Sequence, residues 1–169
     1  MGVTRLNHAV LYVSDLDRSV TFYSDVLGFV PVADMPKGIR AAFLRAADST
    51  NDHDLGLFEL PGAVPAAARA VGLYHLAWEV DTLATLEQVG ARLASAGALV
   101  GATDHGTTKS FYGRDPDGIE FEVVWLVPAD RLDPAAIAAR SQLRPLDLAR
   151  EKQRYGADTR GGVGISVPA

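Results

Sequence analysis

Three polar residues interrupt otherwise apolar segments, and together they have the chemistry to hold a metal ion. His8 lies in the apolar segment 5–13, His75 lies in 73–80, and Glu122 lies among the apolar residues that precede Val127. A polar group buried in a strand needs a hydrogen-bond partner or a metal to offset its desolvation. Two imidazoles and one carboxylate form the facial triad that suits non-haem Fe(II) and leaves positions open for substrate and O2. This ligand set also suits Mn(II).

The first half of the chain begins with the pattern of a strand followed by a helix. Apolar residues occupy both faces of segment 5–13, as in a buried strand. Apolar residues at helical spacing predict a helix over 15–27, with Ser14 as its N-cap and Gly28 as the residue that ends it. The apolar residues after Gly28 predict a second strand.

The second half repeats this order. His75 lies in a strand, Asp81 or Thr82 caps the helix that follows, and Gly97 ends that helix. The repeat has the length of one βαβ unit with hairpins. His8 and His75 therefore occupy equivalent places in two modules, which favours a shared metal site over two unrelated strand histidines.

The remaining segments complete the two modules and leave a tail. The turn Asp115-Pro116-Asp117-Gly118 has the residues of a tight turn and nothing that requires a further role. We expect one domain over 1–128, with modules at 5–62 and 70–128 joined by a linker at 61–69, and a helical or extended tail over 129–169 that breaks at Pro145. Further strands are expected at 39–46, 55–60, 98–100, 110–113 and 119–127.

The composition excludes several classes of function. The chain has 169 residues and no cysteine, which excludes disulfides, thiolate nucleophiles and Cys-bound metals. Its net charge of −5 and the lack of a Lys/Arg cluster argue against nucleic-acid or anionic-membrane partners. No apolar signal segment or stretch of about 18 apolar residues is present. We expect a cytoplasmic protein whose partner is a small molecule.

Three segments of the chain resemble the vicinal oxygen chelate superfamily, which includes glyoxalases, bleomycin resistance proteins and extradiol dioxygenases. They are LNHAVLYVSDLDRSVTFYSDVLGF, GLYHLAWEV and FYGRDPDGIEFEV. The resemblance implies an α+β fold in which paired βαβββ modules form one cupped, partly open mixed β-barrel around a metal held by His8, His75 and Glu122. The chain departs from the dioxygenase pattern at Ile119, where those relatives often have Asn, but this position is no ligand.

The chain is most similar to single-barrel type I extradiol catechol dioxygenases, and this similarity implies further roles. His53 would act as the acid–base residue, Tyr112 would hydrogen-bond the metal-bound oxygen of the substrate, and His105 would line the substrate mouth. The implied reaction is Fe(II)-dependent cleavage of a catechol-type ring by O2, carried out by a homodimer or higher homo-oligomer.

Charged residues keep two other functions open. Glyoxalase-like members carry a fourth carboxylate ligand in the strand that holds Glu59, so an inward-facing Glu59 would favour a metal-dependent isomerase, lyase or epimerase. Glu120 shares the strand face of Glu122 and is the other candidate for the carboxylate ligand. Lys109 and Arg114 are either substrate-binding cations or solvated charges. The second alternative is a metal-free protein that binds a flat drug or metabolite.

Overall fold

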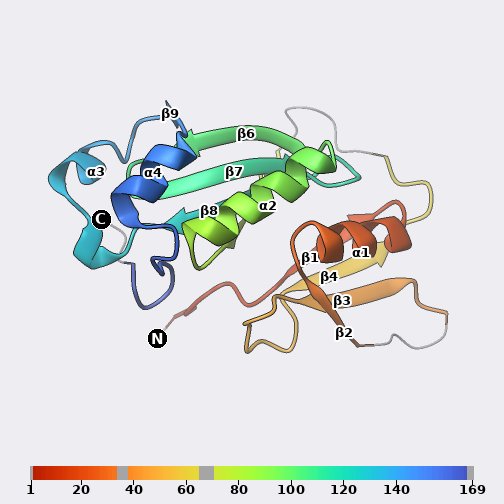
Figure 1. Cartoon of the computed structure of the whole chain (residues 1–169). Coiled ribbons are helices and arrows are strands. Elements are labelled where there is room, and N and C mark those ends of the chain that lie inside the picture. Colours follow the sequence, from red (N-terminus) through yellow and green to blue (C-terminus); the bar gives the residue numbers. More distant parts are fainter. Residues whose placement is uncertain (1, 34–37, 65–70, 167–169) are drawn as a thin grey trace. The chain divides into compact units, whose positions relative to one another are not determined.

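The computed structural model describes residues 2–33, 38–64 and 71–166, and it contains two compact units (Figure 1). One unit comprises Met1–Val71 with Asp115–Ile119, and the other comprises Gly72–Arg114 with Glu120–Ala169. Each unit holds one βαβββ module, so the predicted α+β class with paired modules is confirmed. The predicted linker 61–69 lies outside the described residues from 65 onward. No described helix is long and apolar enough to cross a membrane.

The first unit is a four-stranded mixed sheet with one helix. Its strand order is β1-β4-β3-β2, in which β1 and β4 are parallel and the other neighbours are antiparallel. The core is formed by apolar side chains such as Leu44, Leu55 and Leu57, which are completely buried. The elements are β1 (Ala9–Val13), α1 (Leu16–Asp25), β2 (Val30–Ala33), β3 (Ala41–Arg45) and β4 (Leu55–Glu59).

The second unit is a five-stranded mixed sheet of order β5-β8-β7-β6-β9. The helix α2 buries Leu83, Leu86 and Leu93, and it runs along the strands β6, β7 and β8 (Figure 1). The elements are β5 (Leu76–Glu79), α2 (Leu83–Ser95), β6 (Leu99–Asp104), β7 (Thr108–Arg114), β8 (Glu120–Leu126), a 3-10 helix (Ala129–Arg131), α3 (Pro134–Ala138), β9 (Arg144–Pro145) and α4 (Leu148–Tyr155).

The N-terminus of α1 differs from the prediction. Asp15, not Ser14, is the N-cap, because the carboxylate of Asp15 accepts a hydrogen bond from the backbone N–H of Arg18. The backbone N–H of Ser14 instead donates to Asp117 over 2.9 Å, and its hydroxyl donates to the same carboxylate. Asp117 also pairs with Arg18 at 2.9 Å. The interpretation of this turn as nothing more than a turn was therefore wrong, since Asp117 also binds the start of α1.

The other predicted helix boundaries agree with the structure. Thr82 caps α2 by accepting from the N–H of Thr85, which resolves the choice between Asp81 and Thr82. Gly28 and Gly97 follow the two helices with φ of 81° and 65°, a backbone region that favours glycine.

The predicted helical tail is confirmed, with two short helices, α3 and α4, on either side of Pro145. Pro145 lies in the two-residue strand β9, which pairs with β6 and forms the edge of the second sheet. An edge position tolerates proline because the missing N–H would otherwise face away from the sheet.

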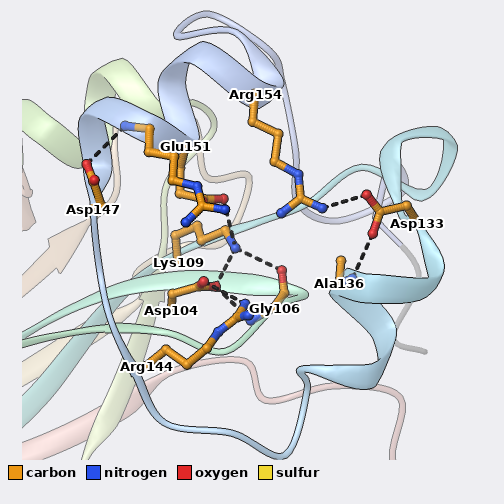
Figure 2. Close-up of polar contacts among 10 residues, drawn as sticks. Asp104, Gly106, Lys109, Asp133, Ala136, Arg144, Asp147, Glu151 and Arg154 are labelled. Carbon is orange, nitrogen blue, oxygen red and sulfur yellow. Dashed lines mark hydrogen bonds and ion pairs between the residues drawn. The ribbon is translucent and has the colours of Figure 1, made fainter.

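A buried cluster of charges fixes this tail to the second sheet (Figure 2). The side chain of Lys109 is completely buried, and its ammonium donates to the carboxylate of Asp104 and, over 2.9 Å, to the carbonyl of Gly106. The same ammonium lies 3.1 Å from Glu151 of α4. Arg144 of β9 contacts the second oxygen of Asp104 at 2.7 Å. Lys109 is therefore a structural cation and not a substrate-binding one.

Candidate functional site

His75 and Glu122 come together in the second unit. Glu122 lies on β8, and His75 directly precedes β5, which is the parallel neighbour of β8. The Nε2 atom of His75 lies 3.3 Å from Oε2 of Glu122, and both side chains are mostly buried, with 24% and 14% of their surface exposed. Two of the three predicted metal ligands are therefore neighbours.

The His75–Glu122 pair fits a metal ion. Imidazole nitrogens and carboxylate oxygens bind transition metals at about 2.0–2.2 Å, so two such ligands side by side on one ion lie roughly 3 Å apart. The Nε2–Oε2 separation of 3.3 Å is of that size.

Tyr112 and His105 lie beside this pair. Tyr112 is directly opposite Glu122 in the β7–β8 ladder, and its ring centroid lies 5.9 Å from that of His75. The Nε2 atom of His105 is 3.0 Å from the hydroxyl of Tyr112. Burial, followed by the charge and hydrogen bonding of Glu122, raises the pKa of Tyr112 to about 12. The hydroxyl of Tyr112 is therefore protonated at neutral pH and can act as a hydrogen-bond donor.

Ser110 is a site residue that the sequence analysis missed. Its side chain is completely buried, and its hydroxyl donates to Oε1 of Glu122 over 2.5 Å. This bond leaves Oε2 of Glu122 for His75 and fixes the direction of the carboxylate. The signal was available, because Ser110 and Tyr112 share a face of one strand by alternation.

Removal of the Ser110 hydroxyl is expected to weaken metal binding without unfolding the chain. Loss of a partner that orients a metal ligand typically lowers metal affinity by about 10–100-fold. We therefore expect Ser110→Ala to lower the affinity for Fe(II) by about that factor, measured by competition with a chromophoric chelator. An affinity equal to that of the wild type would remove Ser110 from the site.

The side chains of the candidate site, without Ser110, open onto one cavity of about 500 Å³ in the second unit. One wall follows β8, where the alternate residues Glu122, Val124 and Leu126 share a face. The cavity is lined by His75, His105, Thr107, Thr108, Tyr112, Glu122, Val124, Leu126, Val127, Arg140 and Ser166.

The first unit brings two other predicted site residues together. The rings of His8 and His53 have centroids 4.5 Å apart, and the ring of His53 also lies 4.6 Å from that of Phe43. The Nδ1 atom of His53 is 2.9 Å from the exposed carboxylate of Asp52. An Nδ1–H bonded in this way leaves Nε2 as the free proton acceptor.

His8 and His75 do not lie within their strands as predicted. His8 immediately precedes β1 and His75 immediately precedes β5, while His53 lies two residues before β4. His8 is exposed rather than buried. The equivalence of His8 and His75 is nevertheless retained, since each is the last residue before the first strand of its module. A strand end is a natural site for a functional side chain, because the backbone there is free of the ladder.

The carboxylate of Glu59 binds residues outside the candidate site. Its carboxylate accepts hydrogen bonds from Arg40 at 3.0 and 3.3 Å and from the backbone N–H of Leu16 at 2.9 Å. The bonds from Arg40, followed by that from Leu16, lower the pKa of Glu59. Glu120 forms an exposed pair with Arg114 at 3.4 Å, which leaves Glu122 as the carboxylate beside His75.

Over the described ranges, no group of three or more His, Asp or Glu side chains is placed to hold a metal ion. The structure brings together two pairs instead. His75 lies with Glu122 in the second unit, and His8 lies with His53 in the first.

Comparisons with known proteins place the chain in a family. The model of the Glyoxalase/Bleomycin resistance protein/Dioxygenase superfamily matches residues 5–123. The chain belongs to this superfamily. A superfamily domain from Frankia sp. EAN1pec has a similar structure, with a TM-score of 0.64 at 23% identity over 74% of this chain and 93% of that one. This likeness concerns the fold alone.

Relatives within the superfamily have different activities. A catechol-2,3-dioxygenase from Bacillus subtilis is 34% identical over 124 residues, which cover 71% of this chain. The match covers only 41% of that dioxygenase, so the chain spans less than half of its length. A lactoylglutathione lyase from Haemophilus influenzae is 32% identical over 121 residues, which cover 69% of this chain and 89% of the lyase.

Proposed function

We propose that the chain is a metal-dependent dioxygenase that cleaves the ring of a catechol-type aromatic with O2, by the extradiol route. The observation that carries this proposal is the group formed by His75, Glu122, Tyr112 and His105 around one cavity. The cavity of about 500 Å³ lies within the usual range for small-molecule sites, about 300–1,000 Å³.

The proposed metal ligands are His75 and Glu122 from the second module and His8 from the first. The ion expected is Fe(II), with Mn(II) as the alternative, because both accept two imidazoles and one carboxylate. When bound, such an ion would supply a positive centre for two adjacent substrate oxygens and an open position for O2. With one anionic ligand, the charge of the ion is only partly neutralised.

The chain's own residues would move and hold protons. Tyr112, which keeps its proton at neutral pH, donates a hydrogen bond to a substrate oxygen. His105 contacts the Tyr112 hydroxyl and orients it. His53, with its Nδ1 on Asp52, presents Nε2 as the base that accepts a substrate proton and later returns it.

A lyase on the same scaffold is the second candidate. The match to the Haemophilus influenzae lyase over 89% of its length favours it. Against it stands Glu59, which binds Arg40 and the N-terminus of α1 and so is not free to act as a fourth ligand or a base.

The direct test is oxygen uptake by protein purified anaerobically and loaded with Fe(II). The proposal predicts O2 consumption with at least one member of a catechol panel, together with a yellow ring-opened product. Bound Zn or Ni with turnover of a glutathione hemithioacetal and no oxygen uptake would favour the lyase. If the protein takes up no metal under any loading condition but still binds members of the catechol panel, the result would favour the function of a binding protein.

The His53→Phe variant should separate proton transfer from metal binding. Loss of an acid–base group lowers turnover by about 10²-fold or more, whereas Phe can keep the ring contact with Phe43. We therefore expect metal content and the thermal midpoint of unfolding to stay near the wild-type values while steady-state oxygen uptake falls. Full activity in this variant would remove His53 from the mechanism.

A further inference from the structure

Two residues of the C-terminal segment line the cavity. Arg140 follows α3, and Ser166 lies near the end of the described chain. The hydroxyl of Ser166 donates to the carbonyl of Leu126 over 3.1 Å and accepts from the N–H of Gly162 at 3.0 Å, so Ser166 is fixed against β8.

The turn between β6 and β7 places α3, and with it Arg140. Gly106 lies in this turn with φ of 76°, and an added Cβ would lie 2.2 Å from the carbonyl oxygen of Ala136 and 2.9 Å from Cβ of Ala139. Only glycine permits this approach, and both alanines are buried by it. The backbone N–H of Arg140 then closes the last turn of α3 on the carbonyl of Ile137.

Ion pairs hold α3 in this place (Figure 2). Asp133 caps α3 by accepting from the N–H of Ala136 at 2.7 Å, and its other oxygen receives Arg154 of α4 at 2.5 Å. The helix α4 in turn contributes Glu151 to the buried cluster around Lys109. Arg140 is thus carried by a fixed part of the fold rather than by a loose tail.

Arg140 is an exposed arginine, and its charge balance differs from that of three other arginines of the same segment. Arg144 pairs with Asp104, Arg154 pairs with Asp133, and Arg131 lies 3.9 Å from Asp130. Within the part of the chain that the structure describes, the guanidinium of Arg140 has no carboxylate partner. A cation that lines a cavity without a counterion is suited to bind an anionic ligand.

The place of Arg140 along the cavity indicates which part of a bound ligand it would contact. The Gly106 turn joins β6 to the start of β7, where Thr108 pairs with Leu126, while Tyr112 pairs with Glu122 four residues earlier on β8. Four residues of a strand span about 13 Å. The backbone of Arg140 therefore lies nearer to the Leu126 end of this cavity wall, while Glu122 marks the other end, with Val124 between them.

We propose that Arg140 binds a carboxylate on the substrate, so that the substrate class is a catechol with an acidic substituent on the ring or on a short side chain. This inference rests on the proposed function, since the diol is taken to lie at the His75–Glu122 end. The apolar wall receives the ring, and the planar guanidinium matches a carboxylate with two hydrogen bonds.

The test compares two catechols that differ in the carboxylate. Iron-loaded wild-type protein and the Arg140→Gln variant are titrated anaerobically in a calorimeter with 3,4-dihydroxyphenylacetate and with 4-methylcatechol. The same proteins without metal are titrated with phenylacetate, which has no diol. Arg131→Gln is the matched control, because Arg131, like Arg140, is an exposed arginine of the C-terminal segment but does not line the cavity.

The proposal predicts that the wild type binds the acid more tightly than 4-methylcatechol and that Arg140→Gln weakens only the acid, by about tenfold or more. The Arg131→Gln variant should bind both catechols with the affinities of the wild type. Equal affinities for the two catechols in the wild type, or a preference for the acid that survives in Arg140→Gln, would overturn it.

The phenylacetate titration separates this inference from the proposed function. If no member of the catechol panel supports oxygen uptake but phenylacetate binding depends on Arg140, the anion site stands and the dioxygenase proposal fails. If a catechol is cleaved but no acid depends on Arg140, the dioxygenase proposal stands and the inference about Arg140 fails. If phenylacetate binding is absent or independent of Arg140 and no catechol is cleaved, both fail.

Discussion

Replacement of Glu122 by Ala is expected to remove the bound metal and abolish oxygen uptake. Glu122 is the only anionic residue of the proposed ligand set, and its carboxylate lies 3.3 Å from His75. Loss of an outer partner alone costs about 10–100-fold in metal affinity, so loss of the ligand itself should cost more than about 100-fold. Metal analysis after anaerobic purification measures the first effect, and an oxygen electrode measures the second.

The matched control is Glu120→Ala. Glu120 lies on the same strand two residues earlier, but its partner is the exposed Arg114 at 3.4 Å. This variant should keep the metal and the activity. Circular dichroism shows whether Glu122→Ala is folded, since that change also leaves the buried Ser110 hydroxyl without its acceptor. Folded Glu122→Ala with a full metal complement would contradict the assignment, as would loss of metal in Glu120→Ala.

Among the variants proposed here, Lys109→Met is expected to lower the free energy of unfolding the most. The Lys109 side chain has no exposed surface, and its removal leaves Asp104 and Glu151 as buried carboxylates without their shared cation. Removal of one partner from a buried ion pair typically costs about 3–5 kcal/mol. We expect the free energy of unfolding, measured with urea, to fall by about that amount.

The control for this variant is Lys152→Met. Lys152 of α4 forms an ion pair with Glu87 at 2.6 Å, but both side chains are partly exposed. Such pairs contribute about 0–1 kcal/mol. A loss of stability in Lys109→Met no greater than that in Lys152→Met would show that the cluster does not hold the tail in place.

Acid titration gives a second readout of the Lys109 cluster. Burial alone would raise the pKa of Asp104, but the hydrogen bonds from Lys109 and from the Gly106 N–H outweigh it and lower the pKa. In the wild type, the stability from this carboxylate is present above its unfolded pKa of about 3.9 and is lost as the pH falls through the lower folded value. In Lys109→Met, burial is opposed only by the Gly106 N–H and by Arg144, so the pKa of Asp104 should rise above its unfolded value. Acidification through that raised pKa toward pH ~4 should then restore part of the lost stability.

Much of the fold could be predicted from local patterns in the sequence. Period-2 and helical spacings placed every strand of both modules and the helices α1 and α2, and the glycines 28 and 97 marked the helix ends. The error at the start of α1 has a physical cause. Both Ser14 and Asp15 can cap a helix, and the choice was decided by Asp117, which lies about a hundred residues away in the chain and binds Ser14.

The sequence predicted the site residues that occupy equivalent places in the two modules, but it did not predict those that come from the C-terminal tail. The equivalence of His8 and His75 in the two modules pointed to a metal, and the resemblance supplied Tyr112, His105 and His53. Arg140 had no sequence signal, because its place in the cavity depends on the close approach of α3 to Gly106. The burial of Lys109 was equally hidden, since both of its carboxylate partners had to be brought in by the fold.

The measurement that tests the dioxygenase proposal most directly is a single turnover with labelled oxygen. Iron-loaded protein is mixed under an atmosphere of 18O2 with 3,4-dihydroxyphenylacetate in one reaction and with 4-methylcatechol in another. Each product is analysed by mass spectrometry as soon as it forms. The proposal predicts a ring-opened product that carries both atoms of one O2 molecule. Recovery of unchanged catechol, or of a product without label, from protein with a full complement of iron would contradict it.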